Sequence, residues 1–118
     1  MDEATDGLSA ATLGELLEDE YARSILAETS VEPLSAAELA ERCDASSPTI
    51  YRRINRLQEL DMLDEQQTLN PDGHHYRRFS AQLERVTIEL QDGGYEVSVD
   101  RTTDDAVDRF TELYEGLR

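Results

Sequence analysis

The sequence has no lysine, no tryptophan, one cysteine and no long apolar run. A single thiol, Cys43, cannot form an internal disulfide and cannot build a thiolate metal site alone. No apolar run approaches the roughly 20 residues of a membrane-spanning helix, and the acidic N-terminus lacks the basic and apolar stretches of a secretory signal. We therefore expect a cytoplasmic protein that has no membrane partner.

The chain has a large excess of negative charge. Its 118 residues carry 27 Asp and Glu against 11 cations, all of them arginine, which gives a formal net charge of -16. This composition resembles that of proteins from salt-in halophiles; the alternative is an ordinary acidic protein with a solvated surface. At about 1 M salt the Debye length falls to about 3 Å, so such charges repel little beyond contact. The length allows one compact domain or a domain with a tail, and excludes two independent domains.

The first third of the chain shows helical periodicity. Residues 1–9 are small and polar and are predicted to form a flexible tail. Thr12 and Glu15 form a capping box, and apolar residues then recur at helical spacing over 12–29. The acidic cluster around Asp19 marks a break between two shorter helices, with Asp19 available as the second cap.

A helix-turn-helix pattern follows. A Ser-x-x-Glu capping box at Ser35 predicts a short helix over 36–43, followed by a tight connection of three or four residues. Ser47 is the expected cap of the next helix, and Pro48 takes its first position, where a missing N–H costs nothing. This second helix is predicted to run to about Leu60.

The remaining chain changes to a period of two and then returns to a helical pattern. Segments 62–69 and 74–80 flank Asn70-Pro71-Asp72-Gly73 and predict a β-hairpin. Segments 86–90 and 95–99 alternate around Asp92-Gly93-Gly94 and predict a second hairpin. A last helix is expected to begin near residue 103. Its apolar stripe forms a core or dimer contact, and it includes Val107, Phe110, Leu113, Tyr114 and Leu117.

The acidic charge is interrupted in one place. The net charge is -10 over residues 1–44, zero over 45–80 and -6 over 81–118. Residues 45–58 contain three arginines and no acid. On the predicted helix Ile50, Ile54 and Leu57 share one side, so the polar residues between them face solvent. One face of this helix is therefore free of carboxylates, although the chain as a whole is acidic.

That face carries groups that recognise DNA. Arginine binds guanine or phosphate through two hydrogen bonds, asparagine pairs with adenine, and hydroxyl groups near a helix N-terminus bind phosphate oxygens. Thr49, Arg52, Asn55 and Arg56 lie on the outer side, with Tyr51 and Arg53 on the flanks. The predicted DNA contacts of this segment are Ser46, Ser47, Thr49, Tyr51, Arg52, Arg53, Asn55 and Arg56.

Three segments together resemble a known family. They are Glu38-Leu39-Ala40, the string from Asp44 to Ile54 followed by Leu57, and Asp61-Met62-Leu63. This pattern is similar to the winged helix-turn-helix of arsenical-resistance-repressor-type (ArsR-like) transcription regulators, particularly haloarchaeal ones, over about residues 12–80.

The resemblance implies that the second helix of the motif enters the major groove. It also implies that the hairpin 62–80 is a wing that lies along the DNA backbone or minor groove, with Arg77 and Arg78 as its phosphate contacts. The family pattern has glycine where this chain has Asp44 and Asp61, and aspartate tolerates the left-handed conformation needed there better than most residues. The metal-sensing branch of the family needs clusters of Cys or His, which this chain lacks, so no metal site or cofactor is implied.

The predicted fold is α+β and mainly helical, a winged helix-turn-helix with a second β-hairpin and a C-terminal helix. The predicted organisation is a tail over 1–9, a DNA-binding domain over 10–80 and an extension for packing or dimerisation over 81–118. We expect a homodimeric DNA-binding regulator rather than an enzyme, with no particular small-molecule effector indicated. Dimer contacts are expected from Leu13, Leu17 and the C-terminal stripe. The alternatives are a winged helix that binds other proteins and a dimerising adaptor.

Overall fold

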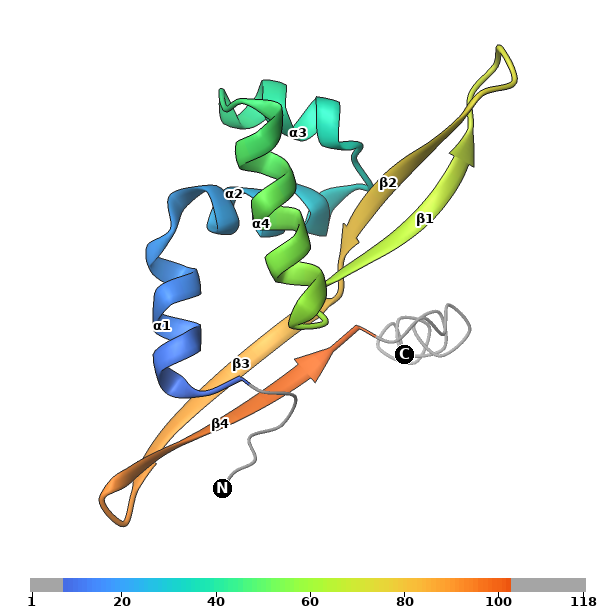
Figure 1. Cartoon of the computed structure of the whole chain (residues 1–118). Helices are drawn as coiled ribbons and strands as arrows, with labels where there is room; N and C mark the ends of the chain where they lie inside the picture. Colours follow the sequence, from blue (N-terminus) through green and yellow to red (C-terminus); the bar gives the residue numbers. More distant parts are fainter. Residues whose placement is uncertain (1–7, 103–118) are drawn as a thin grey trace, which may run out of the picture.

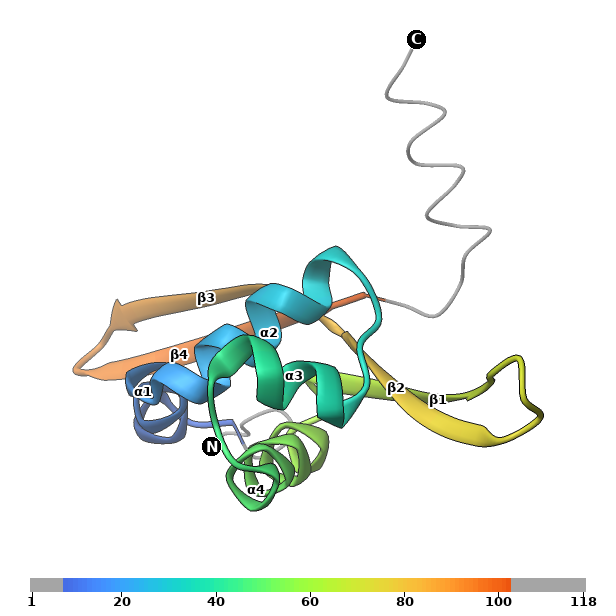
Figure 2. The same ribbon diagram turned by 90° about the horizontal axis from the view of Figure 1, so that it is seen from above.

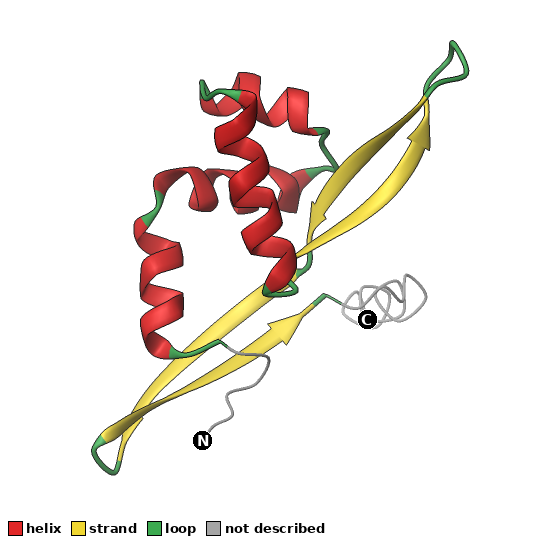
Figure 3. Cartoon of the chain, viewed as in Figure 1, coloured by secondary structure: helices red, strands yellow, loops and turns green. Residues whose placement is uncertain are grey.

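Four helices precede two β-hairpins in the computed structural model, which describes residues 8–102 (Figures 1 and 3). The fold is α+β, with a helix-turn-helix followed by a hairpin that forms a wing. No helix in this part of the chain is long and apolar enough to cross a membrane. The elements are α1 (Ala10–Glu18), α2 (Glu20–Val31), α3 (Ala36–Cys43), α4 (Ser47–Glu59), β1 (Leu63–Leu69), β2 (His75–Ala81), β3 (Leu83–Gln91) and β4 (Gly94–Arg101).

Helix α1 begins earlier than predicted. Ser9, and not Thr12, is the N-cap, because the Ser9 hydroxyl accepts a hydrogen bond from the Thr12 backbone N–H at 3.1 Å. Two alanines, which favour helix, extend the helix back to this cap. Leu8 is 1% exposed and lies in the core. The expected tail over 1–9 is therefore wrong for Leu8 and Ser9, which belong to the folded domain.

The break between α1 and α2 lies where the acidic cluster predicts it. Helix α1 ends at Glu18, and the Asp19 carboxylate accepts a hydrogen bond from the Tyr21 backbone N–H at 3.0 Å. This side chain satisfies one of the donors that a helix N-terminus leaves unpaired. Asp19 is thus the N-cap of α2, as predicted.

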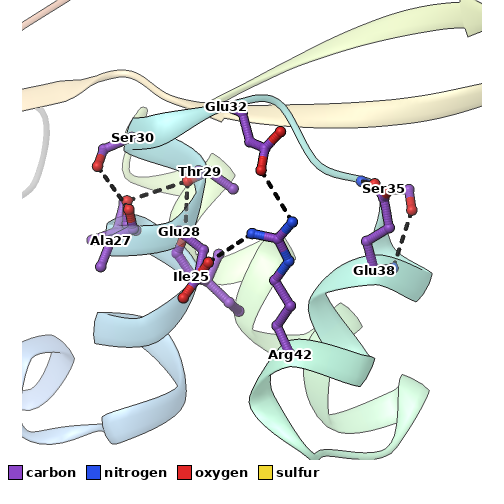
Figure 4. Close-up of polar contacts among 10 residues, drawn as sticks. Ile25, Ala27, Glu28, Thr29, Ser30, Glu32, Ser35, Glu38 and Arg42 are labelled. Carbon is purple, nitrogen blue, oxygen red and sulfur yellow. Dashed lines mark hydrogen bonds and ion pairs between the residues drawn. The ribbon is translucent and has the colours of Figure 1, made fainter.

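Helix α3 is held by its own cap and by a contact with α2. Ser35 and Glu38 form the predicted capping box at its start. Near its end, the Arg42 guanidinium donates to Glu28 at 2.9 Å and to Glu32 at 3.0 Å on α2 (Figure 4). Both partners of Arg42 are exposed, so these ion pairs fix the direction of α3 more than they stabilise the fold.

The connection between α3 and α4 has three residues. Asp44 takes the left-handed conformation with φ of 54°, as expected for the position that often holds glycine. The prediction of Ser47 as the cap of α4 is wrong by one residue. The Ser46 hydroxyl accepts from the Thr49 N–H at 3.3 Å, so the helix already begins at Ser47 and Pro48 lies in its first turn.

One hydrophobic core joins the helices to the base of the wing. It is formed by apolar side chains from all four helices, the loops and both strands of the wing. Ile50, Ile54 and Leu57 are the contribution of α4, and they are the three residues predicted to share its inner side. Their burial fixes which face of α4 points outward.

The wing is the antiparallel hairpin of β1 and β2. Its register runs from Leu63 opposite Ala81 to Leu69 opposite His75, which agrees with the predicted hairpin. Leu34, in the loop after α2, adds an isolated bridge that the sequence did not predict. The Leu34 N–H donates to the Phe79 carbonyl at 3.0 Å, and the Phe79 N–H donates back at 2.7 Å.

The second hairpin, β3 and β4, is longer than predicted. Its turn has positive φ at Asp92 (51°) and Gly93 (81°), the conformation of a two-residue type I′ turn. The Gln82 N–H donates to the Met62 carbonyl at 2.7 Å, which ties the start of this hairpin to the base of the wing. The two hairpins extend in opposite directions (Figure 1). The predicted C-terminal helix, with its five stripe residues, lies outside the described residues.

Candidate nucleic-acid interface

Helix α4 presents a polar face to solvent. It is the outermost helix on one side of the molecule when seen from above (Figure 2). Arg52, Asn55 and Arg56 are exposed on it, and Thr49 is half-buried. The sequence therefore predicted correctly which face of this helix is accessible.

The two arginines at the centre of this face differ in their partners. Arg52 makes no hydrogen bond or ion pair within residues 8–102. Arg56 lies 3.7 Å from Glu59, one turn further along the same helix. Both side chains of that pair are solvent-exposed, and such pairs contribute about 0 to 1 kcal/mol. A phosphate or a guanine can therefore replace Glu59 as the partner of Arg56 at little cost.

Arg53 points away from this face. Its Nε donates to the Asp19 carboxylate at 2.5 Å, and its guanidinium lies 5.5 Å from the centroid of the Tyr21 ring. Burial of Asp19 acts to raise the pKa of its carboxyl, but the hydrogen bonds from Arg53 and Tyr21 and the charge of Arg53 outweigh it, so this pKa lies below its ordinary value. The prediction of Arg53 as a DNA contact is thus corrected: Arg53 joins α4 to the start of α2.

The wing reaches α4 through Arg77. The Arg77 guanidinium lies 5.9 Å from the Tyr51 ring centroid and 5.6 Å from that of Phe79, distances at which a cation is attracted to a ring. Arg78, on the other side of the strand, lies 3.5 Å from the Pro33 carbonyl in the loop after α2. Of the two wing arginines that the sequence predicted as candidates, the structure places Arg77 alone beside α4.

The N-terminal turn of α4 carries hydroxyl groups and no acid. The Ser46 hydroxyl lies 3.0 Å from that of Thr49, and both Ser46 and Ser47 are exposed. The partial positive charge of a helix N-terminus favours anions at such a position. These residues stand where the sequence predicted phosphate contacts.

Two acids border the surface, and the sequence analysis did not single them out. Glu59 lies beside Arg56, and Glu65 on β1 accepts from Gln58 at 2.9 Å and from Arg77 at 3.4 Å. Glu59 pairs with Arg56, and Glu65 pairs with Arg77. The part of the α4 face that has no acid nearby is therefore narrower than the net charge of residues 45–80 indicates. Its centre is at Arg52 and Asn55.

Arg101 is a further residue that the sequence analysis missed. Its Nε donates to the Asp61 carbonyl at 2.8 Å, and its Nη2 donates to the Leu60 carbonyl at 2.9 Å. These carbonyls stand directly after α4, where a helix has unpaired acceptors and favours a cation. Arg101 thus connects the second hairpin to the end of α4.

Cys43 and the histidines lie away from the polar face of α4. Partial burial and the nearby Glu28 raise the pKa of the Cys43 thiol, so it stays protonated. His74 lies at the exposed tip of the wing, 3.2 Å from Asp72. Residues 8–102 contain no group of three or more His, Cys, Asp or Glu that could hold a metal ion.

The two dimer candidates on α1 differ in exposure. Leu13 is buried in the chain's own core, which corrects its assignment to an intermolecular contact. Leu17 is 43% exposed and remains available to a partner.

Comparison with known families agrees with this arrangement. Residues 16–66 match the model of a family described as "Helix-turn-helix domain". The match begins in α1 and ends within β1, so it includes the whole of α2, α3 and α4. No curated protein shows a significant match to the chain. Residues 16–66 are therefore similar to a helix-turn-helix domain, and α4 is the second helix of that motif in the fold.

Proposed function

We propose that this protein is a sequence-specific DNA-binding transcription regulator and that α4 enters the major groove. The observation that carries the proposal is the outer face of α4, where Arg52 is exposed and unpaired within residues 8–102 and Asn55 and Arg56 lie beside it. A major groove is wide enough for one helix, and its base edges offer the acceptors and donors that these side chains match.

The position of each residue on α4 and the wing decides whether it is assigned to a base or to a phosphate. Arg52 and Arg56 are assigned to guanine or phosphate, Asn55 to adenine, and Thr49 to a base edge or phosphate near the helix start. Ser46 and Ser47 are assigned to phosphate oxygens at the N-terminus of α4. On the wing, Arg77 beside Tyr51 is assigned to the DNA backbone. Arg53 and Arg78 are left out because their partners, Asp19 and the Pro33 carbonyl, lie away from the outer face of α4.

The protein is proposed to act as a homodimer. One helix covers only a few base pairs, and helix-turn-helix proteins bind two half-sites about 34 Å apart, or a multiple of this, through two-fold dimers. Leu17 is exposed on α1 and is the assigned contact there. The C-terminal residues Val107, Phe110, Leu113, Tyr114 and Leu117 are assigned to the same interface on the strength of their sequence pattern.

We further propose that the protein is an ArsR-like regulator of a haloarchaeon. It would then bind DNA in a cytoplasm of high salt concentration. With a slope of about -0.9 per phosphate contact, a dimer that neutralises about six phosphates loses about 10⁷ in affinity between about 0.1 and 2 M salt. Contacts to base edges and the fit to DNA shape must then supply more of the binding energy than counterion release does. Arg52, Asn55 and Arg56 should therefore matter more than the total charge of the surface.

Selection of duplexes from a random pool at about 2 M KCl tests this function. The selected duplex is then used to measure affinity for the wild type, for Arg52→Ala combined with Arg56→Ala, and for Arg85→Ala. Arg85 is an exposed arginine on β3 that pairs with Asp100 at 3.4 Å, so its removal controls for the loss of an arginine charge away from α4. We expect the double variant to bind at least about 30-fold more weakly, since each lost base contact costs about 1 to 3 kcal/mol.

Two outcomes would reject the assignment. One is an equal affinity of the double variant and the control. The other is a wild type that selects no duplex at all, which would favour the alternative in which the winged helix binds another protein. The acids Glu59 and Glu65 at the border of α4 are the feature that favours that alternative, because they would meet a basic partner.

A further inference from the structure

The second hairpin has one apolar face, and only part of it is covered. Side chains alternate along a strand, so residues two apart lie on the same face, together with their partners across the hairpin. The cross-strand pairs on this face are Val86 with Val99, Ile88 with Val97 and Leu90 with Tyr95. Val86, Val97 and Val99 pack against the core. Ile88, Leu90 and Tyr95 are 50%, 69% and 67% exposed, and we call these three residues the tip face.

The tip face is apolar, whereas the opposite face of the hairpin is polar. Thr87 and Ser98 oppose each other there, as do Glu89 and Glu96. The three exposed side chains present a few hundred Å² of apolar surface, roughly the size at which a patch on a soluble protein marks an interaction site. Since the chain carries a net charge of -16, an uncharged face is where two copies can approach without opposing carboxylates.

The end of the described chain lies far from the tip of the hairpin. The described chain ends at Thr102, next to the root of the hairpin, where the Thr102 N–H donates to the Gln82 carbonyl. Tyr95 lies about 23 Å from there along β4, at about 3.3 Å per residue. Between the two points the apolar face is already occupied, because Val97 and Val99 pack against the core. Thr102 therefore lies beyond this packed region as seen from the tip, whereas a second copy of the chain reaches the tip directly.

We propose that the tip face binds a second copy of this chain, with two hairpins packed apolar face to apolar face about a two-fold axis. A two-fold contact uses the same patch on both copies, which suits a patch with no charge to match. The wing extends away from this hairpin (Figure 1), so the contact leaves the wing and α4 accessible. The inference deepens the proposed function, on which it rests for the need of a dimer, by adding the tip face to the contacts proposed for that homodimer, and its test requires no DNA.

The test is the mass of the full chain in solution, measured by sedimentation equilibrium at about 2 M KCl without DNA. Leu90→Glu places a charge in the contact, and Thr87→Glu places the same charge on the opposite face of the same strand. Both positions are exposed in the single chain, so both variants should keep the thermal midpoint of the wild type. We expect the wild type and Thr87→Glu to dimerise equally, and Leu90→Glu to dimerise at least about 100-fold more weakly.

A second variant guards against an indirect effect of the new charge. Tyr95→Ser removes the largest apolar side chain of the tip face without adding charge, and it should weaken the dimer about tenfold or more. A wild type that stays monomeric at about 100 μM, or a Leu90→Glu variant that dimerises like Thr87→Glu, would overturn the inference. A monomer that still binds a selected half-site would overturn the inference and leave the proposed function standing. A dimer that binds no duplex would support the inference and overturn the proposed function.

Discussion

Arg101 donates a hydrogen bond to the backbone carbonyl of Asp61 at 2.8 Å, across 40 positions of sequence. Asp61 is left-handed, with φ of 58°, and follows directly on the C-cap of α4. The last strand of the second hairpin thus fixes the end of the helix that carries the candidate DNA contacts.

Replacing Arg101 should lower the stability of the fold. Arg101→Ala removes the charge-assisted hydrogen bonds to the Asp61 and Leu60 carbonyls, each of which contributes about 1.5 to 3 kcal/mol. We expect a loss of at least about 2 kcal/mol in the free energy of unfolding, measured by urea titration. Arg85→Ala, on the exposed part of the same hairpin, should change it by less than about 0.5 kcal/mol. An equal loss in the free energy of unfolding for Arg101→Ala and Arg85→Ala would show that the link to Asp61 does not stabilise the fold.

The ion pair of Asp19 and Arg53 should make stability depend on acid. The pKa of Asp19 is lowered in the folded chain, so its contribution is complete above the ordinary aspartate pKa of about 4 and is lost as pH falls through the lower folded value. Asp19→Asn keeps a good N-cap but removes the charge. We expect the variant to lose stability at pH 6 and to show a shallower fall between about pH 5 and 2, measured by urea midpoints.

Arg53→Gln is the matching change on the other side of this pair. It should reproduce the loss at pH 6, because Asp19 then lacks its charged partner. Should Asp19→Asn retain the full acid dependence of the wild type, the pair would not be its source.

Arg52→Lys should separate charge from geometry. Lysine keeps the positive charge but cannot form the forked pair of hydrogen bonds to guanine. We expect affinity for the selected duplex to fall about 5- to 150-fold while affinity for unrelated DNA at low salt stays within about twofold. Anisotropy titrations of the two duplexes measure both. An equal loss on both would assign Arg52 to the phosphate backbone instead.

Local signals predicted much of the fold. Capping residues and apolar spacing placed α3 at its observed bounds and the ends of α4 within one residue, because caps act over three or four positions of sequence. Turn residues located both hairpins for the same reason. The error at the start of α1 arose where two serine or threonine residues, Ser9 and Thr12, could each serve as the cap.

Contacts between distant segments could not be predicted in this way. Periodicity gives the direction in which a side chain leaves its helix, but not what stands opposite. The pairing of Arg53 with Asp19 spans 34 positions, and the bridge between Leu34 and Phe79 joins a loop to a strand. Arg53 was therefore predicted to face DNA, whereas Arg52, one position earlier, has the predicted exposure.

The most direct test is to map which residues contact DNA in the complex. Backbone amide shifts of the ¹⁵N-labelled protein are followed by NMR during titration with the selected duplex at high salt. The account predicts the largest changes over residues 46–56 and at Arg77, with little change on the polar face of the second hairpin around Glu89. Changes confined to the acidic helices or that hairpin, with α4 unaffected, would contradict it.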